Sequence, residues 1–357
     1  MRPTLLIFWA PFDLGIFQNI LFELKKSNDN VETLQVKHLN DKSAFWRNKG
    51  IKNSSLPNVI YLLYQILKIN YRIFFYRKVY IFGTNAVVFA LPHIVVNRAK
   101  IIAHLNELPK FLDGEMFLFS SIERLVLRKI KWLVISNNER LQLLGNYISA
   151  DVKTFVLENV LNYRYYSVQN PNFLIKTEEP YFKFIYAGMI SKNRDIHLLV
   201  DFFSGNKKTK LDLVGPVDQD YREEFLKSIQ GSSTVTWHGV VNFEQTQKFI
   251  LSANFGVALY TLKNNNNKFC APVKIHEYFY QRLPVLVYHN PSLRNIIQNY
   301  KIALAIDDLV SISQDDFNKR VTEFCSHLNN QQFIDFEQRS LSDFKTEFER
   351  LKSVALA

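Results

Sequence analysis

The sequence predicts an α/β protein made of two doubly wound domains, each built on a parallel sheet. Short apolar runs of strand length alternate with longer helical stretches, and this alternation lapses once, at residues 163–180. Strands that alternate with helices are typical of βαβ units, in which helices cover both faces of a parallel sheet. A length of 357 residues suits two domains, and 47% hydrophobic with 22% charged residues is an ordinary globular balance.

The first half of the chain contains six strand candidates, all of them short apolar runs. They cover residues 5–9, 31–36, 79–82, 100–104, 132–136 and 153–157. Helical stretches separate them at about 15–26, 58–77, 85–97 and 120–129, and a short helix begins at Asn138. Residues 163–180 are rich in Asn, Pro, Gln and Thr and lack periodicity, which predicts an interdomain linker.

The second half repeats this rhythm with six further strand candidates, at 183–187, 209–214, 234–237, 255–260, 284–288 and 302–306. A polar amphipathic pattern from about residue 331 predicts a last helix. We therefore expect an N-terminal domain at 1–163, a C-terminal domain at 164–330, and a helix at 331–357 that is able to pack back on the first domain. Two such domains would hold a ligand at the carboxyl ends of their strands.

The composition limits the classes of protein that fit. Two cysteines, Cys270 and Cys325, cannot build a disulfide framework, and a chain of this length buries a large core without one. No apolar run reaches the roughly 18 to 20 residues that cross a bilayer, so an integral membrane protein is not expected. These features favour a cytoplasmic, reducing environment.

The net charge of +11 is unevenly placed. Residues 1–165 hold 22 Lys and Arg against 12 Asp and Glu (+10), whereas residues 166–357 hold 22 against 21 (+1). A basic half suits an anionic partner, either nucleic acid or the lipid phosphates of an acidic membrane leaflet. A solvated basic face with no partner is the alternative.

One segment of this basic half, residues 56–78, interleaves Tyr and Phe with Lys68, Arg72, Arg77 and Lys78. Aromatic rings with basic neighbours suit a membrane interface. A helix packed in the core, with its basic groups reaching out to solvent, fits the same pattern. Because the charge asymmetry points to an anionic surface, we expect peripheral binding to the inner face of the cell membrane.

The most informative stretch is residues 253–287, where an apolar strand leads through an Asn-rich loop into the helical sequence APVKIHEYFY. Pro272 stands just inside the first turn of this helix, where proline is favoured. Lys274 and Glu277 are three residues apart and share one helix face near its N-terminus, where unpaired backbone N–H groups attract anions. The pattern predicts a phosphate-bearing ligand, with an ordinary surface ion pair as the alternative.

Glycines end other strands of this half. Gly188 follows the strand at 183–187, and Arg194 lies beside the next helix start, while Gly215 and Gly239 follow the next two strands. Glycine allows close approach of the backbone to a ligand, and Arg offers a bidentate fork to phosphate oxygens. Because this loop and the Lys274 helix would face the same crevice, we favour a phosphate site over a simple turn with a solvated Arg.

Two acidic residues, Asp218 and Asp220, resemble the metal-binding carboxylate pair of some sugar-nucleotide enzymes. An N-cap and first-turn acid of the following helix explain them better, because negative charge stabilises that position through the helix dipole. We predict that no metal is bound.

The order of these motifs, strand-G-x5-R, LVGP, WHGxV, an Asn-rich loop, APxKxxEY and PVL, resembles the carboxyl-terminal half of GT-B glycosyltransferases. The likeness covers most of residues 183–306 and is closest to family-four-like bacterial enzymes that build surface polysaccharides. It implies that Glu277 accepts hydrogen bonds from the ribose of a nucleotide sugar. It also implies that Arg194 and Lys274 neutralise the diphosphate, on which charge grows in the transition state.

The first domain carries weaker counterparts of the same resemblance. The segment PFDLGIF places Asp13 and Gly15 in a loop that lies near the donor in this family, and IIAHLNELPKF resembles its H-x-H-E-x-P segment through His104 and Glu107. Glu107 would orient the acceptor hydroxyl or the transferred sugar, and Asp13 or Glu107 would be the base of an inverting reaction. A core histidine on a strand end is the alternative for His104.

The sequence also departs from the family. Phe269 stands where many members have the first Glu of an E-x7-E motif, and residues 281–283 replace the Gly before the next strand. A subgroup with A-P-x-K-x-x-E tolerates the first change, and a retaining reaction is the expectation.

The resemblance implies transfer of a sugar from a nucleotide-diphosphate donor to a hydroxyl of a lipid-linked glycan, in polysaccharide, lipopolysaccharide or capsule synthesis, without a metal or other cofactor. A sugar-nucleotide epimerase of the same fold is one alternative. A non-enzymatic nucleic-acid-binding protein is another, but the sequence shows neither a groove-reading element nor an aromatic stacking motif, so we expect no nucleic-acid partner.

Overall fold

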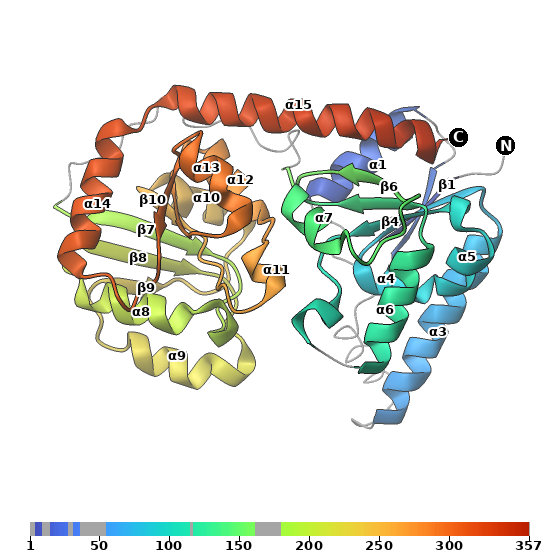
Figure 1. The fold of residues 1–357 in the computed structure, drawn as a ribbon. Coiled ribbons are helices and arrows are strands. Elements are labelled where there is room, and N and C mark those ends of the chain that lie inside the picture. Colours follow the sequence, from blue (N-terminus) through green and yellow to red (C-terminus); the bar gives the residue numbers. More distant parts are fainter. Residues whose placement is uncertain are drawn as a thin grey trace. The chain divides into compact units, whose positions relative to one another are not determined.

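The computed structural model describes residues 4–8, 15–27, 31–35, 55–114, 117–160 and 180–356. The chain divides into two compact units (Figure 1): unit 1 is Met1–Asn162 with Ser342–Ala357, and unit 2 is Tyr163–Leu341. Apart from Pro180, the expected linker at 163–180 lies outside the described residues. No helix of the described part of the chain is long and apolar enough to cross a membrane.

Unit 1 contains a six-stranded sheet in which all neighbouring strands are parallel, as the sequence predicts. Its order is β2 (Val31–Gln35), β1 (Thr4–Phe8), β3 (Lys78–Phe82), β4 (Ile101–Leu105), β5 (Trp132–Ile135) and β6 (Lys153–Val156). The central strands are buried along their whole length, which is why they read as unbroken apolar runs.

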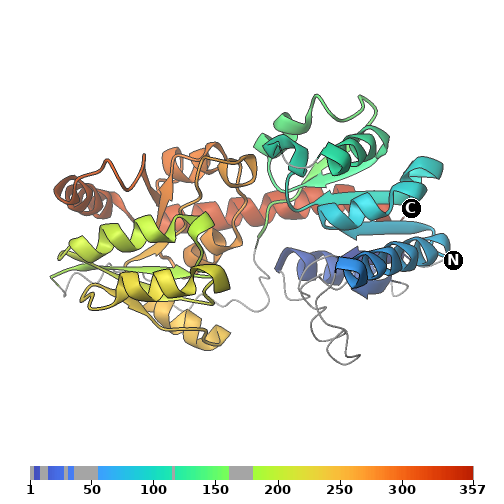
Figure 2. The ribbon, with the colours of Figure 1, turned by 90° about the horizontal axis from the view of Figure 1, so that it is seen from below.

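The helices of unit 1 cover this sheet (Figures 1 and 2). They are α1 (Gly15–Ser27), α3 (Ser55–Phe74), α4 (Thr84–Phe89), α5 (Leu91–Val96), α6 (Phe117–Lys129) and α7 (Asn138–Leu144). The single helix expected at 85–97 is wrong, because the structure has two short helices there. Pro92 has no backbone N–H to continue the ladder, so a new helix begins at Leu91.

Unit 2 contains the second parallel sheet, again with six strands. Its order is β12 (Ala303–Ile306), β11 (Val285–Tyr288), β10 (Phe255–Val257), β7 (Phe182–Ala187), β8 (Thr209–Val214) and β9 (Val235–Trp237). From β7 the chain adds β8 and β9 on one side. It then crosses back and adds β10, β11 and β12 on the other side. The switch point therefore lies between β7 and β10, and ligands of such sheets bind beyond the carboxyl ends of the strands at this point.

Helices cover both faces of the second sheet. The helices α8 (Ile196–Gly205), α9 (Arg222–Ile229) and α14 (Gln314–His327) pack on one face, and α10 (Phe243–Leu251), α12 (Val273–Tyr280) and α13 (Arg294–Gln298) pack on the other. Side chains alternate between the two faces, so that Phe184 of β7 lies in one apolar cluster and the adjacent Ile185 in the other.

The C-terminal helix α15 (Asn330–Ala355) contributes to both cores. Phe333 and Phe336 belong to an apolar cluster of unit 2, whereas Phe344, Phe348 and Leu351 belong to the apolar cluster of unit 1 that includes β1 and α1. The amphipathic pattern from about residue 331 thus correctly predicts a helix.

Candidate functional site

Three glycines lie just beyond the carboxyl ends of the adjacent strands β7, β8 and β9 of unit 2. Gly188 follows β7, Gly215 follows β8 and Gly239 follows β9, with φ angles of 147°, 134° and 76°. The N–H of Gly188 donates to Val214 O at 2.7 Å, and the N–H of Gly215 donates to Gly239 O at 2.8 Å. A Cβ on Gly215 would lie 2.1 Å from the carbonyl oxygen of Gly188, so no other residue fits there without moving the backbone.

Lys274 lies directly against the first of these turns. Helix α12 begins at Val273, and Pro272 stands at its N-cap rather than inside the first turn as expected. The ammonium nitrogen of Lys274 lies 4.0 Å from the ring centroid of Tyr186, and a Cβ on Gly188 would lie 2.2 Å from it. The Lys274 side chain therefore occupies the space that Gly188 leaves open.

Arg194 reaches the same place from the short 3₁₀ turn Lys192–Arg194 that follows β7. It is half-buried, and its guanidinium donates a hydrogen bond to the hydroxyl oxygen of Tyr186. Burial alone would lower the pKa of Arg194, but the facing hydroxyls of Tyr186 and Tyr260 outweigh burial and raise it. One tyrosine thus holds both cations, Lys274 on its ring and Arg194 on its hydroxyl.

The charge of Lys274 is strongly affected by these surroundings. The pKa of Lys274 is lowered from 10.5 to about 7, chiefly by burial and in addition by the nearby positive charge of Arg194, while the carboxylate of Glu277 acts in the opposite direction. Glu277 lies one turn further along α12 and is half-buried. Arg194, Lys274 and Glu277 therefore interact electrostatically within one site at the edge of the sheet, and an anion bound there would favour the charged form of Lys274.

Sequence reasoning missed the tyrosines of this site. Tyr278 accepts a hydrogen bond from the N–H of Ala187 at 3.1 Å, and its ring packs against Gly256, where a Cβ would lie 2.4 Å away. Tyr186 also donates to the carbonyl of Met189 at 2.8 Å, which secures the turn that carries Gly188. The signal that would have found Tyr186 is its place in a strand that borders the switch point, two residues before the turn glycine.

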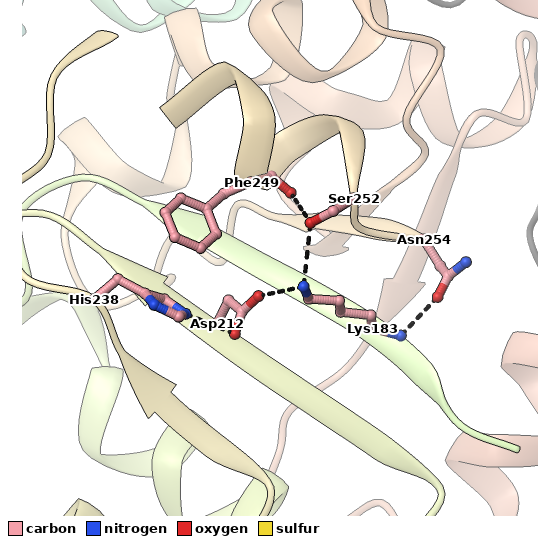
Figure 3. Close-up of polar contacts among 6 residues, drawn as sticks. All are labelled: Lys183, Asp212, His238, Phe249, Ser252 and Asn254. Atoms are coloured by element: carbon pink, nitrogen blue, oxygen red, sulfur yellow. Dashed lines mark hydrogen bonds and ion pairs between the residues drawn. The ribbon is translucent and has the colours of Figure 1, made fainter. Parts of the chain in front are cut away.

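A polar network fixes the third glycine turn (Figure 3). Asp212 of β8 lies between two side chains, with Lys183 Nζ at 2.8 Å and His238 Nε2 at 2.9 Å. Lys183 also donates to the hydroxyl of Ser252 at 3.1 Å, and the ring of His238 lies on the ring of Phe249, with centroids 4.2 Å apart. The network holds His238, and with it Gly239, against β8 and α10.

The expected site residues of unit 1 have different environments. His104 is fully buried in β4, its Nδ1 lies 2.6 Å from the hydroxyl of Tyr80, and burial lowers its pKa to about 3. This placement favours the core histidine over a catalytic role. Glu107 is exposed beyond the end of β4, and its backbone carbonyl accepts a hydrogen bond from Thr84 at 2.8 Å. Gly15 begins α1, and Asp13 lies outside the described residues.

Asn106, which stands at the second His of the H-x-H-E-x-P pattern, is held by the first turns of α4 and α7. Its side-chain oxygen accepts from the N–H of Thr84 at 3.3 Å, and its carbonyl accepts from the buried Arg140 at 2.7 Å. Arg140 also donates to the hydroxyl of Ser136 at 3.2 Å. These contacts fix the backbone that carries the exposed Glu107.

The acidic pair of unit 2 lies in a short 3₁₀ turn directly before α9 and not in the first turn of α9, and Asp218 makes no side-chain capping hydrogen bond. Asp218 occupies the N-cap position of the 3₁₀ turn Gln219–Tyr221, and Asp220 lies within that turn. Within the described residues, no group of three or more His, Cys, Asp and Glu is arranged to hold a metal ion.

Comparison with known proteins adds the fold class. No family model matches the sequence, and no curated protein matches it. Among solved structures, HepE from Anabaena in complex with UDP-glucose has a TM-score of 0.70 at 14% identity, covering 99% of this chain and 100% of that chain. Sucrose-phosphate synthase from Thermosynechococcus elongatus has a TM-score of 0.69 at 11% identity, covering 99% and 98%.

A third similar structure is WaaG, a glycosyltransferase involved in lipopolysaccharide biosynthesis, with a TM-score of 0.63 at 10% identity over 99% of each chain. The chain therefore has the GT-B fold, as the resemblance implied.

Proposed function

We propose that this protein is a glycosyltransferase that moves a sugar from a nucleoside-diphosphate donor to a hydroxyl of a glycan acceptor. The observation that carries the proposal is the convergence of Arg194, Lys274 and Glu277 beside the Gly188 turn, at the switch point of a sheet. Similar structures were determined with UDP and with UDP-glucose, which supports the same class of donor here.

Each group has a role in this proposal. Lys274 and Arg194 bind the diphosphate, and they bind it more strongly as charge grows on the leaving group, which accelerates transfer. The backbone N–H groups at the start of α12 add partial positive charge. Gly188 and Gly215 allow the phosphates to approach the backbone, and Glu277 accepts hydrogen bonds from the ribose hydroxyls.

We assign the acceptor to unit 1, where Glu107 is exposed beyond β4 on a backbone fixed by Thr84 and Arg140. A lipid-linked acceptor at the cytoplasmic membrane face, in polysaccharide, lipopolysaccharide or capsule synthesis, suits the basic excess of residues 1–165. We propose that the reaction proceeds with retention. It needs no metal, because Arg194 and Lys274 supply the positive charge that the leaving diphosphate requires.

A nucleotide panel tests the proposal directly. Nucleoside diphosphates will raise the melting temperature, because a ligand that binds only the folded state stabilises it, by about 2.7 kcal/mol at a hundredfold excess over Kd. The matching nucleosides, which lack phosphates, will give a much smaller shift. Equal shifts for diphosphate and nucleoside would contradict a diphosphate site. Conversion of the donor into a free epimeric sugar nucleotide would instead indicate an epimerase of the same fold.

Replacing Glu277 with Gln is expected to weaken binding of the nucleoside diphosphate about tenfold or more, because a charge-assisted hydrogen bond to the ribose is lost. Calorimetry of the diphosphate and of its 2′,3′-dideoxy analogue measures the effect, since the analogue will be insensitive to the substitution. The matched control is Glu223→Gln on α9, which changes an exposed carboxylate of the same unit. If Glu277→Gln binds both nucleotides as the wild type does, Glu277 does not contact the ribose.

A further inference from the structure

Helix α3 of unit 1, together with Phe75 directly after it, carries large apolar side chains on a face that no described part of the chain covers. Six of them are between 49% and 69% exposed: Leu63, Tyr64, Leu67, Tyr71, Phe74 and Phe75. At 3.6 residues per turn these positions fall within an arc of roughly 120° of the helix surface. We call these six residues the α3 stripe. Figure 1 shows α3 on the outside of its unit.

A different face of the same helix packs into the core of unit 1. Ile69, Ile73 and Tyr76 are buried, and they lie on the opposite side of the helix from the α3 stripe. A surface helix normally pairs one apolar face with a polar one, and a helix that is apolar on both sides is normally buried. Contiguous apolar surface of this kind on a folded protein marks an interaction site.

Helix α5 extends the apolar surface. The imidazole Nε2 of His93 in α5 lies 2.8 Å from the carbonyl oxygen of Asn70 in α3, which places the two helices side by side. Val95 and Val96, at the end of α5, are 55% and 84% exposed. Exposed aliphatic side chains therefore lie on the helix next to the α3 stripe.

Cations outnumber acidic groups around this patch. Residues 55–100 hold six Lys and Arg and no Asp or Glu. Two of the six are paired with carboxylates from elsewhere in unit 1, Arg72 with Glu32 and Arg98 with Asp151, which leaves Lys68, Arg77, Lys78 and Lys100. Lys100 Nζ donates to the carbonyl of Phe74 at 3.3 Å, so a cation lies at the end of the stripe. The exposed Arg77 lies two residues beyond Phe75. Lys68 is half-buried one residue beyond Leu67 of the stripe.

We infer that the α3 stripe and the end of α5 form a docking surface for an anionic lipid bilayer. Leucine, valine and phenylalanine gain from contact with acyl chains, tyrosine suits the boundary between the acyl chains and the head groups, and Lys68, Arg77 and Lys100 would meet the lipid phosphates. A second copy of the chain fits less well, because a twofold interface places the same basic surface on both sides. Nucleic acid also fits less well, because it has no apolar phase like the acyl chains of a bilayer in which aliphatic side chains could be buried.

This inference deepens the proposed function and rests on it in one respect: the bilayer would be the source of the lipid-linked acceptor. Binding to vesicles needs neither donor nor acceptor, whereas the nucleotide panel needs no lipid. A failure of one assay is therefore distinguishable from a failure of the other.

Vesicle co-sedimentation tests the surface. The full chain is expected to bind phosphatidylcholine vesicles that contain phosphatidylglycerol, and the triple variant Leu67→Gln, Tyr71→Gln, Phe74→Gln is expected to bind them about tenfold more weakly or worse. The control, Leu226→Gln with Val310→Gln, replaces exposed apolar side chains of unit 2 and will bind as the wild type does. Melting temperatures near that of the wild type show that both variants are folded.

A charge variant completes the test. Lys68→Gln with Arg77→Gln should remove most of the preference for phosphatidylglycerol and flatten the loss of binding as salt rises. The inference is overturned if the wild type ignores anionic vesicles, or if the stripe variant binds them unchanged. It is also overturned if ultracentrifugation shows a wild-type dimer that the stripe variant converts to a monomer, since a second copy would then cover the stripe.

Discussion

Lys274→Met will lower kcat/KM for the donor about 100- to 1,000-fold, the usual cost of removing one preorganised group that stabilises charge in the transition state. The methionine retains the shape of the side chain beside Tyr186 and Gly188, so the substitution removes charge without opening a large cavity. Steady-state rates measure the effect, with Lys227→Met as the control on an exposed lysine of α9. Rates within a factor of a few of the wild type would remove Lys274 from the mechanism.

The same residue gives the protein a pH dependence of known sign. In the free protein the pKa of Lys274 is about 7. Because only the ammonium form attracts a diphosphate, affinity will fall as pH rises through about 7, and Lys274→Met will lose this dependence. Stability will change in the opposite direction. The unfolded chain holds the lysine proton up to its ordinary pKa of 10.5, so the free energy of unfolding rises with pH between about 7 and 10.5.

Gly215→Ala will destabilise the protein by about 3 kcal/mol or more, the range of strongly disruptive point substitutions. Its Cβ would lie 2.1 Å from the carbonyl oxygen of Gly188, and backbone atoms at that place cannot move aside as a flexible side chain does. The φ of 134° adds strain for any L residue. The loss also distorts the turn that receives the diphosphate, so nucleotide affinity will fall with stability.

Gly231 serves as a control that distinguishes the cost of a positive φ angle from the cost of a steric clash at Cβ. Gly231 has a φ of 77° with nothing within 4 Å of its Cβ position, so Gly231→Ala carries only the left-handed backbone cost of about 1 to 2 kcal/mol. Urea unfolding of both variants measures the difference. Equal losses of stability would show that the close approach of Gly215 to Gly188 is not what excludes a side chain there.

The sheets were predictable because their strands are buried on both faces and read as continuous apolar runs. Strand β11 is one example, with all four of its residues buried. Boundaries were less predictable where backbone chemistry competes with the pattern. Pro92 divides the helix expected at 85–97, and within the expected Asn-rich loop the side chain of Asn264 caps a one-turn helix, Asn265–Lys268.

The features of the site that depend on local sequence were predictable. Strand-end glycines and the three-residue spacing of Lys274 and Glu277 predict an anion site, and the structure brings these groups together with Arg194. Tyr186 could not be assigned, because its role comes from two partners that meet only in the folded unit. The face on which His104 lies depends on the register between β3 and β4, in which Phe82 pairs with His104.

A crystal structure with the nucleoside diphosphate that the panel selects would show directly whether Arg194, Lys274 and Glu277 form the donor site. Phosphate oxygens are expected within hydrogen-bond distance of Lys274 and Arg194, close to the backbone of Gly188, with the ribose hydroxyls on the carboxylate of Glu277. A nucleotide bound elsewhere, or bound there with its phosphates turned away from both cations, would contradict it.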